Sequence, residues 1–188
     1  MNHLISTTSA SAALMTGLPL PAGATGRATL ELASSKYVPR IKDGAKAYKK
    51  DVYKAVGSGN LEALAAAVAE PRKKTKEDKA KADAGFAERA ASAGPFSDAR
   101  VLAAMDLYAA AFSDRAESNK TKAMKKEVAT LRSIVGEWRA LSAGGGKGSK
   151  GGATRAKELY KEGGDTFNRY VYTANLGLNI KFEKLDYL

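Results

Sequence analysis

The sequence contains no cysteine and a single histidine, His3, so several kinds of chemistry have no residues to carry them. Without cysteine there are no disulfides, no thiol nucleophile and no thiolate metal site. Nucleophilic catalysis usually relies on a base that titrates near neutral pH, and His3 lies in an apolar leader-like segment. The carboxylates are scattered, without a spacing that would gather several oxygens around a hard cation. We therefore expect no enzyme activity, with no catalytic residue, no metal site and no cofactor.

Charged residues are also absent before Arg27. The apolar part of this segment ends in Ala22-Gly23-Ala24, small residues of the kind that a signal peptidase reads, but no basic residues precede it. Glycine and proline interrupt the segment, which is too short to span a bilayer. Two interpretations stay open: residues 1–24 are a cleaved export signal, or residues 1–35 form an extended N-terminal arm.

Basic residues, by contrast, are abundant. Thirty-one Lys and Arg against twenty Asp and Glu give a formal net charge of +11. Such an excess favours an acidic partner, which leaves nucleic acid, anionic lipid and an acidic protein surface as candidates. No Arg-rich recognition helix or aromatic stacking platform accompanies the charges, so we rank a protein partner above nucleic acid.

Apolar residues from Lys36 onward recur at intervals of three and four, without strict alternation, which predicts an all-α chain. Four helical stripes are expected to face inward. They are Tyr37, Ile41, Ala45, Tyr48, Val52 and Val56; Val101, Met105, Tyr108 and Phe112; Met124, Val128, Leu131, Val135 and Trp138; and Leu159, Gly163, Phe167, Tyr170 and Ala174.

Glycine, proline and capping residues predict where the helices end. Gly57-Ser58-Gly59 ends the first helix and Asn60 caps the second. Pro71 breaks or kinks the second helix, because proline lacks the N–H donor. Ser97 and Asn119 are expected to cap the third and fourth helices.

The nine residues 144–152 include six glycines and predict a flexible loop before a last helix over residues 154–174. They do not form a phosphate loop, because Lys147 is followed by Gly148 and the preceding segment is helical. The expected architecture is an antiparallel four-helix bundle over residues 36–176, with one helix interrupted near Pro71 and a C-terminal tail over residues 177–188.

Two basic patches and the tail are the candidate partner-binding residues. They are Lys42, Lys46, Lys49, Lys50 and Lys54 on the first helix; Arg72, Lys73, Lys74, Lys76, Lys79 and Lys81 after Pro71; and Phe182, Tyr187 and Leu188 in the tail. The alternative for the lysines is a solvated helix surface. The tail, which also carries Leu185, either inserts into a partner or packs back on the helices.

Several stretches of the chain resemble one known family. They are residues 71–83, Phe96 to Leu102, Phe112 to Asp114, Leu159-Tyr160, Gly163-Gly164, Phe167 to Tyr170, Ala174-Asn175 and Lys184 to Leu188. The chain is similar here to PsbQ-like extrinsic subunits, which are lumenal photosystem proteins of algae with red-lineage plastids. The resemblance implies a basic helical bundle without cofactor that supports the oxygen-evolving complex. The missing twin-arginine pair and basic n-region depart from a full lumenal targeting sequence.

The expected function is therefore that of a non-catalytic extrinsic subunit on the lumenal side of a photosystem, photosystem II in the first place. The expected partners are the photosystem core and other extrinsic or antenna subunits, without nucleic acid. The expected location is the thylakoid lumen of a plastid, peripheral to the membrane. Two alternatives remain: a lumenal subunit of a photosystem I–antenna supercomplex, and a basic helical nucleic-acid-binding protein.

Overall fold

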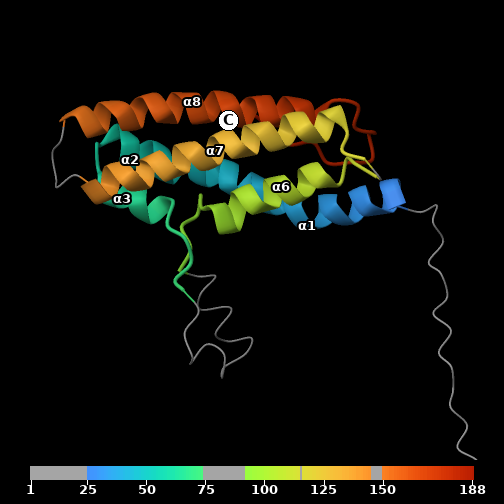
Figure 1. Ribbon diagram of the computed structural model, residues 1–188, viewed down its shortest axis with the longest axis horizontal. Helices are drawn as coiled ribbons and strands as arrows, with labels where there is room; N and C mark the ends of the chain where they lie inside the picture. The colour runs from blue at the N-terminus through green and yellow to red at the C-terminus, as the bar shows by residue number, and fades with distance from the viewer. Residues whose placement is uncertain (1–24, 74–91, 115, 145–149) are drawn as a thin grey trace, which may run out of the picture.

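The computed structural model describes residues 25–73, 92–114, 116–144 and 150–188, and these residues form helices and connecting segments without a strand. The all-α fold class is thus confirmed. The elements are α1 (Thr25–Ala47), the π-helix η1 (Tyr48–Val52), α2 (Tyr53–Gly57), α3 (Leu61–Ala67), the π-helix η2 (Asp98–Leu102), α6 (Ala103–Ala110), α7 (Asn119–Gly144) and α8 (Lys150–Asn175). The helices lie side by side along one long axis (Figure 1).

The element α1 begins eleven residues before the expected start of the bundle at residue 36. Residues 25–35 were assigned to a leader or extended arm, but they are helical. Leu30 packs against the core and Ala33 is buried in it, which gives this part of the helix an apolar side of its own. Pro39 lies inside α1 and cannot donate a backbone hydrogen bond, yet the helix continues through it. The predicted boundary at residue 35 therefore falls inside α1, because Leu30 and Ala33, which precede it, already pack in the core.

The predicted inward stripes are confirmed. The α7 stripe Met124, Val128, Leu131, Val135 and Trp138 is buried throughout, and so are the inward positions predicted for α8. Tyr37 and Phe112 are only partly buried at the edges of their stripes. Trp138, Tyr48 and Phe96 are among the largest fully buried side chains, so the core is aromatic in its middle although the chain is rich in alanine.

Most helix ends follow their predicted signals. Asn60 accepts a hydrogen bond from the Ala63 N–H (2.9 Å) and caps α3, and Ser97 accepts one from Arg100 N–H (3.4 Å) and caps η2. The cap of α7 is Ser118 rather than Asn119, since the Ser118 hydroxyl accepts from the Thr121 N–H at 3.0 Å. Asn119 is the first helical residue instead.

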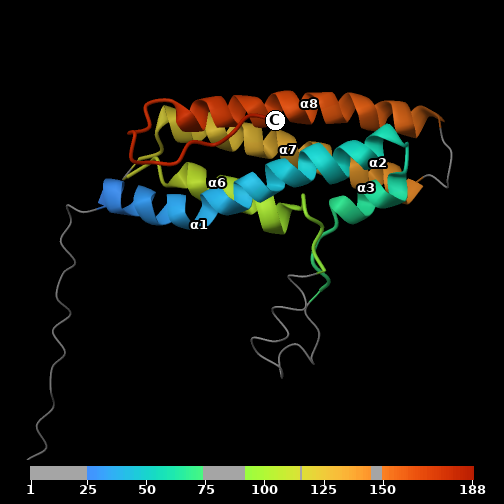
Figure 2. The ribbon, with the colours of Figure 1, turned by 180° about the vertical axis from the view of Figure 1, so that it is seen from behind.

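The second predicted helix ends instead of kinking, since α3 stops at Ala67, four residues before Pro71. After α3 the chain leaves the helices and returns to them at Gly94 and Phe96, whose N–H groups donate to the carbonyls of Ala69 (2.8 Å) and Ala67 (2.9 Å). Gly94 has no room for a side chain, because a Cβ there would meet Ala67 O at 2.4 Å. The short elements α3 and α6 lie one after the other along α7 (Figures 1 and 2).

The glycine-rich connection is shorter than predicted. α7 extends to Gly144 and α8 begins at Lys150, so Gly151 and Gly152 are helical and only residues 145–149 lie between the two helices, outside the described residues. The helices α7 and α8 run in opposite directions beside each other (Figure 1). The last helix therefore starts four residues before the predicted 154.

Candidate docking surface

The five lysines predicted on the first helix do not form one exposed patch. Lys42 is held by the C-terminal tail, with its Nζ 2.5 Å from Glu183 Oε1 and 3.6 Å from Asp186 Oδ2. The hydrogen bond that Lys42 donates to the Glu183 carboxylate raises the pKa of Lys42. Lys46 pairs with Asp43 at 3.2 Å, and Lys49 donates to the Tyr187 carbonyl at 2.8 Å. Three of the five thus have a partner within the chain.

Lys50 and Lys54 are different, because both are exposed and neither has a carboxylate within 4.0 Å in the described part of the chain. Lys54 also lines a shallow cavity of about 440 Å³ between α2 and α3, together with Asp51, Asn60 and Pro95. Four of the nine lining residues are alanines, and the polar ones are Asp51, Lys54, Ser58 and Asn60.

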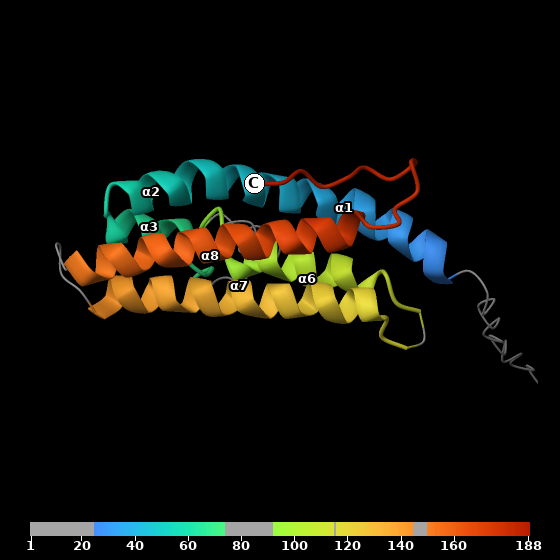
Figure 3. The same cartoon turned by 90° about the horizontal axis from the view of Figure 1, so that it is seen from above.

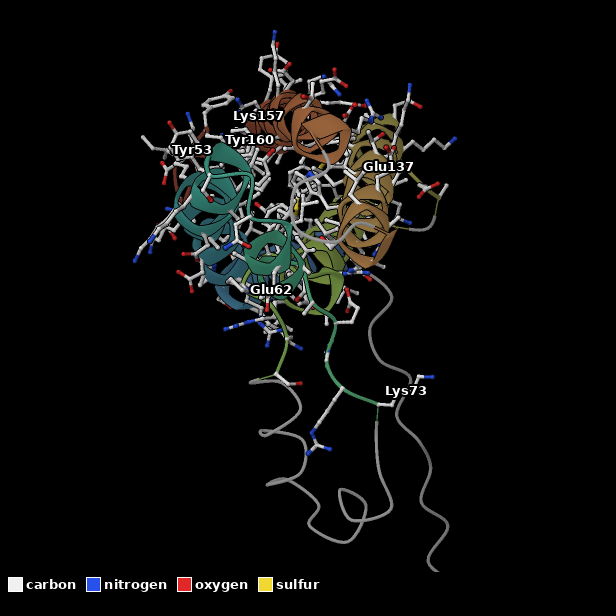
Figure 4. All side chains as sticks on the ribbon, turned by 90° about the vertical axis from the view of Figure 1, so that its left-hand side faces the viewer. Tyr53, Glu62, Lys73, Glu137, Lys157 and Tyr160 are labelled. Carbon is white, nitrogen blue, oxygen red and sulfur yellow. The ribbon has the colours of Figure 1, made fainter. Side chains whose placement is uncertain are left out.

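The second predicted patch lies where the chain leaves the helices. Arg72 and Lys73 are exposed, and the Arg72 N–H donates to Ser92 Oγ at 3.0 Å. Figure 4 shows Lys73 away from the packed helices, at the start of the excursion. The other four predicted residues of this patch, Lys74, Lys76, Lys79 and Lys81, lie outside the described residues.

The tail packs back on the helices. Gly177, with φ of +69°, turns the chain after α8, and the tail then runs beside α1 (Figure 3). Leu185 is 3% exposed and Leu188 packs against the core, whereas Tyr187 is 50% exposed and Phe182 is partly buried. Leu185 and Leu188 thus follow the second alternative for the tail, which is packing back on the helices.

The arginine side chains of α7 and α8 pair with carboxylates. Arg132 on α7 lies between Asp98 (2.8 Å) and Asp106 (3.3 Å). Arg155 and Arg169 on α8 pair with Glu137 and Glu127 of α7 at 2.9 and 3.1 Å, and Arg139 bonds to Glu70. These pairs join helices and are poor docking groups.

One exposed cluster was not predicted. Tyr53 of α2 is 61% exposed, and its ring centroid lies 5.9 Å from that of Tyr160 on α8. Tyr160 in turn stacks on buried Tyr48 at 4.8 Å. Figure 4 shows Tyr53, Tyr160 and Lys157 together where α2 meets α8. We call Tyr53, Lys157, Tyr160 and Lys161 the Tyr–Lys patch. Tyr53 and Lys157 lie on different helices and far apart in sequence, which is why one-helix periodicity did not reveal the patch.

The described residues hold no group of three or more His, Asp or Glu side chains placed to bind a metal ion. None of the helices in the described ranges has the length and apolarity needed to cross a membrane. The described surface thus consists of charged and aromatic side chains around a packed helical core.

No protein-family model, curated protein or solved structure matches the chain. The PsbQ-like resemblance therefore rests on the residues quoted for it alone.

Proposed function

We propose that the chain is a non-catalytic extrinsic subunit that docks on the lumenal side of a photosystem, photosystem II in the first place, and stabilises the oxygen-evolving complex. The docking proposal rests on the contrast between arginines that form ion pairs within the chain and lysines that do not. The bridging arginines are paired with carboxylates, while Lys50, Lys54, Lys157 and Lys161 are exposed and have no ion pair within the described ranges. Exposed cations of this kind attract an acidic partner surface and speed its encounter.

The choice of a photosystem is supported by the PsbQ-like resemblance. Some of the residues that carry it have structural roles: Ser97 caps η2, Phe167 and Tyr170 fill the core, and Leu185 anchors the tail. The resemblance thus concerns how the helices and the tail are built. We accordingly propose an antiparallel four-helix bundle, in which α3 and η2–α6 together form the interrupted helix beside α1–η1–α2, α7 and α8.

The proposed location is the thylakoid lumen of a plastid, peripheral to the membrane, with the photosystem core and other extrinsic or antenna subunits as partners. A photosystem I–antenna supercomplex would offer the same kind of acidic lumenal surface and is the second candidate. The same lysines would also serve a nucleic-acid-binding protein.

The test follows the native protein through a sucrose gradient of detergent-solubilised thylakoids at low salt. Migration with photosystem II supports the first proposal, and migration with photosystem I supports the second. High salt or divalent cations should release the protein from membranes, because ions screen surface charges. Release by nuclease instead of salt would contradict both photosystem proposals. Sequencing the N-terminus of the same native protein shows whether residues 1–24 are removed.

A further inference from the structure

The C-terminal tail shows what kind of segment the side of α1 next to α8 can bind. The tail is not helical, and its acidic residues meet basic ones: Glu183 and Asp186 lie at Lys42. Lys49, two turns further along, donates a hydrogen bond to the Tyr187 carbonyl, and Leu185 is buried in the core. An extended segment with acidic residues around one apolar anchor is thus bound by lysines on one helix and apolar groups below.

The tail also contacts α8 at one point. The Leu188 N–H donates to Asn168 Oδ1 at 2.8 Å. Helical spacing places Gly164, Lys161 and Lys157 on the same side of α8 as Asn168, since they precede it in steps of four, three and four. Lys161 is about 10 Å from Asn168 along the helix axis. On the other helix, Tyr53 lies one turn beyond Lys49. The Tyr–Lys patch therefore continues the tail-binding surface along the same pair of helices (Figures 3 and 4).

The two sides of α8 differ in whether their basic residues form ion pairs. Arg155 and Arg169 bond to α7, and Arg155 also holds Glu158, so this side is occupied and close to neutral. The side toward α2 carries Lys157 and Lys161, both exposed and without an ion pair within the described residues. Between them and α2 lie the rings of Tyr160 and Tyr53. Cations beside exposed tyrosine rings suit a segment that combines carboxylates with an apolar or aromatic side chain.

We propose that the Tyr–Lys patch binds an extended acidic segment of a partner protein, in the manner in which the neighbouring surface binds the chain's own tail. Lys157 and Lys161 pair with the carboxylates of that segment, and Tyr53 and Tyr160 contact its apolar or aromatic side chain. This inference rests on the proposed docking function and names the surface and the chemistry of the partner.

The first test uses a fluorescein-labelled peptide of alternating Glu and Phe, measured by fluorescence anisotropy at low salt on the full chain. The double variant Lys157→Glu, Lys161→Glu should bind this peptide about tenfold or more weakly. The matched control is Lys122→Glu, Lys126→Glu, which reverses two exposed α7 lysines with the same spacing and the same change in net charge. It should change binding by less than about twofold. Equal loss in both double variants would overturn the proposal, since net charge alone would then explain binding.

The aromatic part is tested without a change in charge. Tyr53→Ala should weaken peptide binding, whereas Tyr172→Ala, which removes a similarly exposed ring elsewhere on α8, should not. Unchanged binding by Tyr53→Ala contradicts the tyrosine contact. Far-UV circular dichroism confirms that each variant is folded, and Lys157→Gln, Lys161→Gln gives a neutral version should the Glu variant unfold.

A second measurement separates this inference from the proposed function. The wild-type chain and the same variants are rebound to salt-washed photosystem membranes. Rebinding that the Lys157→Glu, Lys161→Glu variant loses and its control keeps supports the patch as the docking site. Rebinding retained by every variant overturns the patch while the docking function stands. Peptide binding with no wild-type rebinding to either photosystem overturns the docking function while the peptide-binding patch stands. A dimer in sedimentation that depends on Lys157 would mean that a second copy occupies the patch, and this also overturns the proposal.

Discussion

Asn175 at the end of α8 holds the backbone of Leu185 on both sides. Its Nδ2 donates to the Leu185 carbonyl at 2.8 Å, and its Oδ1 accepts from the Leu185 N–H at 2.9 Å. A side-chain amide thus takes the place that a neighbouring strand would have, and Leu185 is buried as a result. The tail is therefore a fixed part of the surface on which docking is proposed.

Replacing Asn175 with Ala should loosen the tail without unfolding the helices. Two hydrogen bonds are lost at a partly buried site, so the Leu185 amide should exchange with solvent about tenfold faster or more. Native-state hydrogen exchange read by NMR measures this directly. The control is Asn179→Ala, since the Asn179 side chain accepts only a local bond from the Lys181 N–H. Unchanged Leu185 protection in Asn175→Ala would show that the apolar contact alone fixes the tail.

The stripes of α7 and α8 could be predicted from the sequence because their spacing keeps every apolar residue on one side of a regular helix. The π-helix η1 could not be predicted. Its stripe Tyr48, Val52 and Val56 advances by four twice in succession, but Tyr37, Ile41 and Ala45 do the same within the regular helix α1. The spacing of apolar residues therefore does not separate the two kinds of helix here.

The beginning of α1 could also be predicted in part from the sequence. Leu30, Ala33 and Tyr37 are spaced by three and four, but the lack of charge before Arg27 and the glycine and proline residues there indicated a leader or an arm. The contacts of Lys42 and Lys49 with the tail, and of Tyr53 with Tyr160, could not be predicted, because they join positions more than a hundred residues apart. Only tertiary packing decides which lysines remain exposed.

Two buried tyrosines should respond oppositely to loss of the hydroxyl. Tyr170 donates to the Met105 carbonyl at 2.7 Å, so Tyr170→Phe should lower the free energy of unfolding by about 1–2 kcal/mol. The Tyr108 hydroxyl is buried and has no hydrogen-bond partner of normal geometry among the described residues, although Ser34 lies near enough to lower its pKa. Tyr108→Phe should therefore leave stability unchanged or raise it by up to about 1 kcal/mol. Urea titration measures both, and a loss of stability in Tyr108→Phe similar to that in Tyr170→Phe would contradict the difference.

Gly44 and Gly136 are both helical, but they differ in the room that is available for a side chain. A Cβ on Gly44 of α1 would meet the Val101 methyls at 2.4 and 2.7 Å, while a Cβ on Gly136 of α7 would meet nothing within 4 Å. Gly136→Ala should stabilise the protein by about 0.5–1 kcal/mol, because alanine is the better helix former. Gly44→Ala should destabilise it by about 1–3 kcal/mol through overpacking against η2. Thermal unfolding of the two variants side by side checks the prediction, which a gain in stability for Gly44→Ala would contradict.

Alkaline pH should destabilise the protein steeply. Burial raises the pKa of Tyr108 to about 12, and it also raises the pKa of Tyr48 and Tyr170 above the ordinary value of 10.0. Above about pH 10 these tyrosines ionise in the unfolded chain but keep their protons in the folded one, so the unfolded state binds fewer protons and stability falls as the pH rises. Each tyrosine contributes up to about 1.4 kcal/mol per pH unit, or about 4 kcal/mol per unit for the three.

Lys120 has the opposite effect on stability. Burial lowers its pKa, so as the pH rises Lys120 loses its proton in the folded chain before it does so in the unfolded chain. Burial also raises the pKa of Tyr160, so Lys120 is one group against four tyrosines, and the tyrosines should dominate. Urea unfolding followed by far-UV circular dichroism between about pH 9 and about pH 11 measures the slope. The double variant Tyr108→Phe, Tyr170→Phe should flatten the slope, since it removes two of the four tyrosines whose pKa is raised in the folded chain. A slope that is the same in this variant and in the wild-type chain would mean that other groups, not the buried tyrosines, govern alkaline unfolding.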